Sequence, residues 1–152
     1  MATHGLPSRI VAHLIAPWPD IGALPPAEAL LLDAMRGWGA ARTPLPAAAL
    51  ILAAEGAEAL AIPLDALLRI VRPLLNCPLC PRSAGDESAV LAAVALAQHG
   101  QRSCALALLL RVAPPLPAYN AMGAVLTLAG GMRAVGLMLA NPFSRGADQG
   151  AG

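Results

Sequence analysis

Residues 25–38 read PPAEALLLDAMRGW, and this stretch shows most clearly which kind of fold the chain forms. Proline suits the first turn of a helix, and Glu28 lies where a negative charge favours the positive helix end. The apolar residues recur at helical spacing and predict one buried stripe, made of Ala27, Leu31, Ala34, Met35 and Trp38. We therefore expect a helix that starts at the prolines, runs to Trp38, and is stopped by Gly37 and Gly39.

The rest of the chain has the same character. Alanine and leucine fill it from about Ala23 to Ala140, and 57% of its 152 residues are hydrophobic, against about 45–50% in typical domains. Aromatic residues make up only 3%, valine and isoleucine are few, and alanine and leucine are strong helix formers. We expect one all-α domain, a compact bundle of about six helices over residues 25–140, after an N-terminal arm (1–24) and before a disordered tail (141–152).

Proline, glycine and charge positions delimit the other helices. The expected ranges are 43–58, 63–73, 86–98, 102–112 and 118–139. The expected buried faces of the second and third helices are Leu50, Ala53, Ala54 and Ala57, and Leu64, Leu67, Leu68 and Val71. Glu55 and Glu58 should face solvent, Asp65 should pair with Arg69 one turn later, and Pro73 should close or kink the third helix.

The charge pattern excludes several functions. The net charge is +1 and lysine is absent, so the chain has no P-loop lysine, no lysine Schiff base and no lysine nucleophile. Cations are scattered and aromatic rings lie far apart in sequence, so we expect no nucleic-acid partner. No acid–base pair, nucleophile motif or cofactor motif is present, and we expect no catalytic residue and no cofactor.

A cysteine pair is the first candidate site. Cys77-Pro78-Leu79-Cys80, in the loop between the two three-helix halves, has the spacing of a redox dithiol or of half a zinc site. His99 and Cys104 could complete a metal site, but the helix between them and the pair spans roughly 20 Å. We favour structural cysteines, and a thiol-redox pair or a metal site shared between two chains remain the alternatives.

The last helix is the second candidate. One face is continuously apolar, with Ala121, Val125, Leu128, Met132, Val135 and Leu139. A second face has only small residues after Tyr119, and such a face lets another backbone approach closely. The candidate interaction surface on it is Gly123, Thr127, Gly130 and Ala134. The sequence leaves three roles open: the central helix of the bundle, a surface for a partner or for self-association, and membrane contact through residues 116–139.

Two features of the sequence indicate the cellular compartment of the protein. They are its first residues and its longest uncharged stretch. Residues 1–19 have too short and too interrupted an apolar run for a secretory signal, and cysteines in such a chain are normally reduced. The stretch between Arg111 and Arg133 has the length of a membrane span but begins with three prolines and contains Asn120. We expect a cytoplasmic protein and keep membrane association as an alternative.

Two stretches resemble a known group of proteins. Asn76-Cys77-Pro78-Leu79-Cys80-Pro81-Arg82, running through Asp86-Glu87 into Leu91-Ala92-Ala93, and residues 27–38 are similar to a family of small Ala/Leu-rich helical proteins of alphaproteobacteria, a domain of unknown function. The resemblance covers residues 25–110 and implies a bacterial, helical protein. It carries no catalytic residue over to this chain. The resemblance and the missing site motifs together lead us to expect a non-enzymatic protein-interaction or assembly module. A homodimer is one form that such a module could take.

Overall fold

The computed structural model describes residues 24–75 and 83–143. These residues form six α-helices and no strand, which confirms the all-α bundle. The helices are α2 (Pro26–Ala40), α3 (Pro44–Leu52), α4 (Ala61–Leu75), α5 (Ser83–Gln98), α6 (Arg102–Val112) and α7 (Pro115–Ala134), and two 3₁₀ turns, η2 (Ala53–Glu55) and η3 (Glu58–Leu60), connect α3 to α4. The expected N-terminal arm, the Cys-Pro-Leu-Cys loop and most of the expected tail lie outside the described residues.

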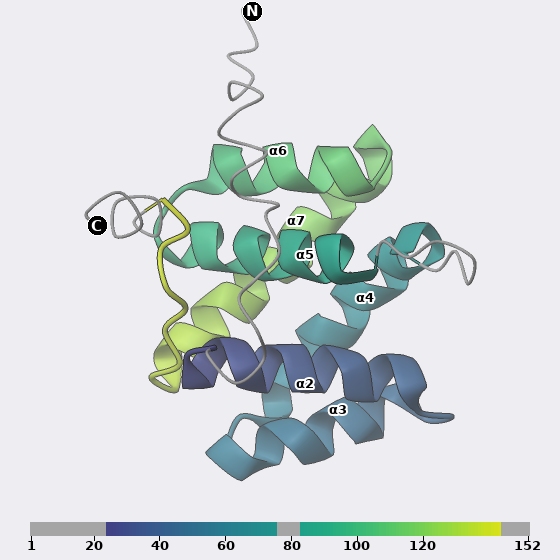
Figure 1. Ribbon diagram of the computed structural model, residues 1–152, viewed down its shortest axis with the longest axis vertical. Helices are drawn as coiled ribbons and strands as arrows, with labels where there is room; N and C mark the ends of the chain where they lie inside the picture. The colour runs from purple at the N-terminus through teal and green to yellow at the C-terminus, as the bar shows by residue number, and fades with distance from the viewer. Residues whose placement is uncertain (1–23, 76–82, 144–152) are drawn as a thin grey trace, which may run out of the picture.

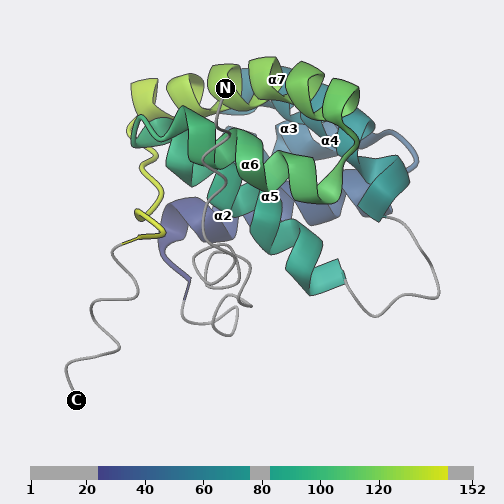
Figure 2. The ribbon, with the colours of Figure 1, turned by 90° about the horizontal axis from the view of Figure 1, so that it is seen from above.

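α5 packs against α6, α7 and α2. In Figure 1, α2 lies against α3 at one end of the molecule and α6 lies against α5 at the other. Turning the molecule shows α7 crossing over one side, where it packs on α4, α5 and α6 (Figure 2). Every residue from Ala89 to Leu96 of α5 is buried, as expected of a helix that is apolar on all sides. α5 is therefore the central helix, and α7 keeps one side exposed.

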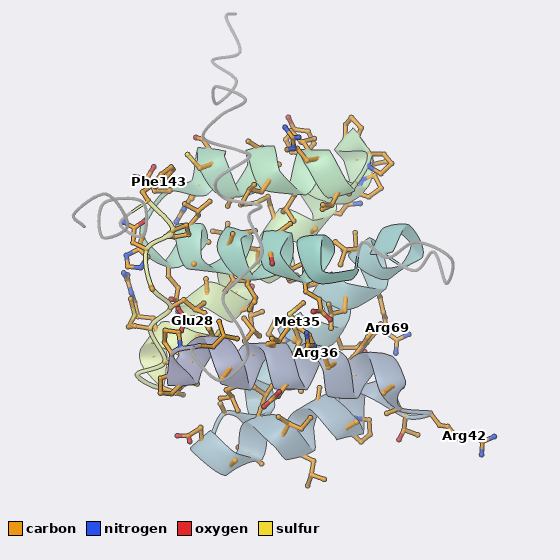
Figure 3. All side chains as sticks on the ribbon, viewed as in Figure 1. Glu28, Met35, Arg36, Arg42, Arg69 and Phe143 are labelled. Atoms are coloured by element: carbon orange, nitrogen blue, oxygen red, sulfur yellow. The ribbon has the colours of Figure 1, made fainter. Side chains whose placement is uncertain are left out.

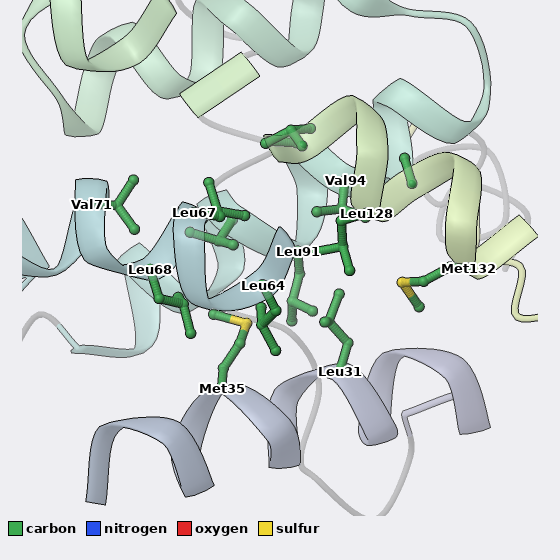
Figure 4. Close-up of a cluster of buried hydrophobic side chains, with 14 of the residues drawn as sticks. Leu31, Met35, Leu64, Leu67, Leu68, Val71, Leu91, Val94, Leu128 and Met132 are labelled. Atoms are coloured by element: carbon green, nitrogen blue, oxygen red, sulfur yellow. The ribbon is translucent and has the colours of Figure 1, made fainter. Parts of the chain in front are cut away.

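Leucine, valine, methionine and alanine side chains from all six described helices form the core. Figure 4 shows Leu31 and Met35 of α2 meeting Leu64 and Leu68 of α4, with Leu91 of α5 between them. The stripes expected on α2 and α4 are buried as the helical spacing predicted. Burying a leucine stabilises the fold by about 1.5–3 kcal/mol, so these stripes set how the helices pack.

The expected end of α2 is wrong. The helix continues through Gly37 and Gly39 to Ala40. α3 passes so closely at Gly37 that a Cβ there would collide with Cδ1 of Ile51. Gly37 therefore serves helix–helix packing and does not act as a stop signal.

The expected second helix is also wrong in length and in its buried face. α3 ends at Leu52, and the chain continues through two 3₁₀ turns around Gly56, whose φ of 65° requires glycine. Leu50 is 78% exposed, whereas Leu52 is 1% exposed. Ala53 and Ala54 are exposed too, while Ala57 is buried and Glu55 and Glu58 face solvent as expected. Residues 47–54 are apolar at every position, so no polar residue marks the outer side.

The next three helices agree better with the sequence. α4 continues past Pro73 to Leu75, so this proline does not close it. α5 begins at Ser83, three residues before the expected start, and ends at Gln98, with Gly100 at φ 77° after it. α6 has the expected bounds, Arg102–Val112, because Pro114 and Pro115 follow it.

The last helix is the largest difference. α7 begins at Pro115 and ends at Ala134, well before the expected Leu139. Gly136, whose φ is 81°, ends the helix. Its N–H donates to the carbonyl of Arg133 (3.0 Å), and the N–H of Leu137 donates to the carbonyl of Met132 (2.8 Å). The following residues, 137–143, are called the strap here, and they run back along the bundle as the yellow chain in Figure 1. Val135, expected to be buried, is exposed because the helix has ended.

Candidate functional site

The small-residue surface predicted on the last helix lies on the exposed side of α7. Gly123, Thr127, Gly130 and Ala134 are all exposed. Tyr119 is 60% exposed and Leu116 is 72% exposed, one and two turns before Gly123. We call these six residues the outer face of α7. Its opposite side, with Ala121, Val125, Leu128 and Met132, is buried in the core as predicted.

The glycines of the outer face have open space around them. A Cβ built at Gly123 or Gly130 would meet no atom within 4 Å outside the local helix. Thr127, between them, donates from its hydroxyl to the carbonyl of Gly123 at 2.9 Å, so this polar group is satisfied within the helix. Within residues 24–75 and 83–143, no packing contact therefore requires glycine at these two positions.

This geometry predicts the effect of adding a methyl group. Gly123→Ala and Gly130→Ala should each raise the free energy of unfolding by about 0.5–1 kcal/mol, because alanine is the better helix former. Gly136→Ala should lower it by about 1 kcal/mol, because its positive φ suits only glycine. Urea unfolding followed by circular dichroism measures the stability of all three variants. If Gly130→Ala and Gly136→Ala changed the free energy of unfolding in the same direction, the backbone conformations assigned to these glycines would be contradicted.

A polar tie connects α2 to α4. The indole N–H of Trp38 donates to Oδ1 of Asp65 (2.7 Å), and Nε of Arg69 donates to Oδ2 of the same carboxylate (2.8 Å). The Arg69 hydrogen bond, more than that of Trp38, lowers the pKa of Asp65 below its ordinary value, while burial acts in the opposite direction. The predicted i,i+4 pair is thus confirmed, and the indole is an additional donor that the spacing did not reveal.

A second tie connects α2 to α5. The guanidinium of Arg36 donates two hydrogen bonds to the carboxylate of Glu87, at 2.9 and 3.3 Å. This contact raises the pKa of Arg36 above its ordinary value, against a smaller effect of burial. Both side chains reach solvent, so the pair adds at most about 1 kcal/mol and orients the helices more than it stabilises them.

Three polar side chains surround the strap, and sequence reasoning missed this cluster. Glu28, interpreted as a partner of the helix dipole, is fully buried, and its Oε1 accepts a hydrogen bond from the N–H of Ala140 (2.6 Å). Gln98 is also buried, and His99 beside it contacts the carbonyl of Leu139 at 2.9 Å. One signal was available: Glu28 lies one turn before Leu31 and so on the apolar side of its own helix.

The cysteine hypothesis falls outside what the structure describes, because Cys77 and Cys80 are in residues 76–82. Cys104 is half-buried on α6, with Sγ 3.9 Å from Oε1 of Gln101. Within residues 24–75 and 83–143, no three histidine, cysteine or acidic side chains converge on a point that could bind a metal ion.

Among the helices of the described ranges, none has both the length and the hydropathy that a membrane span requires. The chain matches no protein-family model, no curated protein and no solved structure. What the protein does must be inferred from its own residues.

Proposed function

We propose that the protein is a non-enzymatic assembly module of the bacterial cytoplasm, and that the outer face of α7 binds a second copy of the chain. One observation carries this proposal: two exposed helical glycines, Gly123 and Gly130, have open space where side chains would fit. Each weakens an isolated helix by about 1 kcal/mol relative to alanine. A close approach by another helix gives these positions a reason to lack a Cβ.

The chemistry of the outer face favours a second copy over a charged partner. From Leu116 to Gly130 no side chain of α7 carries a formal charge. Two such faces can meet about a twofold axis without placing like charges together, and a twofold contact uses the same patch on both chains. Arg133 does not disturb this contact, because its Nη2 donates to the carbonyl of Gln98 (2.7 Å) on α5.

The outer face also offers anchors for association. Leu116 and Tyr119, both largely exposed, flank the small residues on the same side of α7. Tyrosine is enriched among the residues that contribute most to binding at interfaces, where it becomes buried, and an exposed leucine adds apolar area that association can bury.

A bulky residue at Gly130 tests the proposal. We expect Gly130→Leu to weaken self-association at least about tenfold, equal to about 1.4 kcal/mol, because its side chain would hold the two helices apart. Sedimentation equilibrium over a range of concentrations measures this change. Helix content should stay normal, because the added side chain points into open space in the single chain.

Gly39→Leu is the matched control, because Gly39 is also an exposed helical glycine with no neighbour within 4 Å of a built Cβ, but lies on α2. This variant should associate like the unmodified protein. A protein that stays monomeric at all concentrations, or a Gly130→Leu variant with unchanged assembly, would sink the proposal.

A further inference from the structure

The strap is bound to the bundle through its backbone. The side-chain amide of Gln98 donates to the carbonyl of Leu137 (2.9 Å) and accepts from the N–H of Leu139 (2.8 Å). Nε2 of His99 lies 2.9 Å from the carbonyl of Leu139, and Glu28 accepts from the N–H of Ala140 (2.6 Å). Glu28 on α2, Gln98 at the end of α5 and His99 in the turn after it thus hold four backbone groups of the strap.

Such an arrangement resembles the way proteins bind extended peptides. Gln98 contacts residues 137 and 139, two apart, as a neighbouring β-strand would. The strap side chains alternate accordingly: Met138 is 43% exposed, whereas Leu139 is 2% exposed and belongs to the core cluster. The backbone hydrogen bonds would bind a peptide of almost any sequence. The buried site of the Leu139 side chain would select peptides that have a leucine at that position.

The side chains that bind the strap and the strap itself belong to different segments of the chain. Glu28 belongs to α2 and Gln98 to α5, and both helices are held by their own core leucines (Figure 3 shows Glu28 at the start of α2). The strap follows the αL glycine Gly136 and adds no helix to the bundle. Proteins open locally in short segments without unfolding as a whole, and weakening the contacts of such a segment favours its open form.

We propose that the groove bounded by Glu28, Gln98 and His99 is a peptide-binding site, and that the strap occupies it until an extended apolar segment of a partner protein displaces it. The segment has a leucine at the position of Leu139 and a small residue at that of Ala140. Both residues must keep a backbone N–H, because Gln98 and Glu28 accept from these groups. Proline is therefore excluded at either position.

The strap sets how tightly a partner segment binds. A ligand that binds only the open form has its affinity reduced by the fraction of molecules that are open. If the strap is open in about 1% of molecules, the partner segment binds about a hundredfold more weakly than to a groove that is always open. The strap is thus an internal competitor, and weakening it should reveal the site.

The test uses the full chain and a labelled peptide with the sequence of residues 136–143, GLMLANPF. We expect Leu139→Ser to bind this peptide at least about thirtyfold more tightly than the unmodified protein, measured by fluorescence anisotropy, because the strap loses its buried anchor. Adding Gln98→Leu, which has a similar shape but no amide, should weaken binding to Leu139→Ser at least tenfold. A peptide with N-methyl-leucine at the Leu139 position should fail to bind, because the N–H that Gln98 accepts from is gone.

Circular dichroism shows whether Leu139→Ser remains folded. If it does not, Ala140→Pro replaces it, because this change removes the hydrogen bond to Glu28 and leaves the leucine in place. A folded open variant that does not bind the peptide, or equal binding by the unmodified protein and the Gln98→Leu double variant, overturns the proposal. A 1:1 complex between Leu139→Ser and the otherwise unmodified chain that forms even when both chains carry Gly130→Leu would identify a second copy as the occupant and overturn the assignment to a separate partner. No residue of the outer face of α7 takes part in binding the peptide, so the peptide experiment is independent of the self-association experiment.

Discussion

Leu52→Ala is expected to lower the free energy of unfolding by about 3 kcal/mol, whereas Leu50→Ala is expected to change it by less than about 0.5 kcal/mol. The two leucines lie two residues apart on α3 and undergo the same chemical change. Leu52 is 1% exposed and packs in the core, so its truncation leaves a cavity. Leu50 is 78% exposed, so its truncation removes almost no contact.

Urea unfolding at a single protein concentration measures this difference, and each variant serves as the control for the other. The comparison decides between two orientations of one helix, because the sequence pattern alone placed Leu50 on the buried side. Equal destabilisation by both substitutions would mean that α3 is oriented differently from the structure.

Asp65→Ala should have the second largest effect, a loss of about 2 kcal/mol of stability, because the charged acceptor of the buried Trp38 indole is removed. Arg69→Ala should change stability much less than Asp65→Ala, since its side chain is largely exposed and its ion pair is screened by solvent. A double-mutant cycle with Trp38→Phe isolates the indole–carboxylate interaction, because phenylalanine has no N–H to satisfy. Additive effects of the two substitutions would show that this hydrogen bond contributes nothing.

The same carboxylate makes stability depend on pH. The pKa of Asp65 is lower in the folded protein than its ordinary value, mainly through Arg69 and then Trp38. A group with a lowered folded pKa stabilises fully above its unfolded pKa of about 3.9 and loses this contribution as the pH falls through the folded pKa. The stability difference between the unmodified protein and Asp65→Asn should therefore be constant above about pH 5 and shrink below about pH 4. A difference that grows on acidification would have the wrong sign.

Local signals in the sequence predicted much of the fold. Where prolines and glycine flank a helix, as at α6, the expected bounds were confirmed, because these residues act on the backbone of their own segment. Where polar residues alternate with apolar ones, as on α2 and α4, the buried stripes were confirmed as well. Gly37, in contrast, looked like a stop signal, and only the approach of Ile51 explains why it lies inside a helix.

For the candidate surfaces the division is similar. The small residues of α7 could be recognised from their spacing, and the structure places them on the exposed side. The polar cluster around the strap could not be recognised from spacing, because Glu28 and Ala140 lie 112 residues apart. No pattern within one helix specifies which distant backbone group a buried carboxylate will meet.

By itself, the sequence determined that this chain is helical and where several helices begin, because helix propensity and the effects of proline act over a few neighbouring residues. Only the tertiary structure decided which side of α3 is buried, that α5 and not the last helix is central, and that α7 ends early so that the strap can reach Glu28. The physical reason is that alanine and leucine are nearly interchangeable as helix formers. Packing against other segments therefore selects the buried face. In a segment whose residues are all apolar, the sequence pattern does not indicate which face that is.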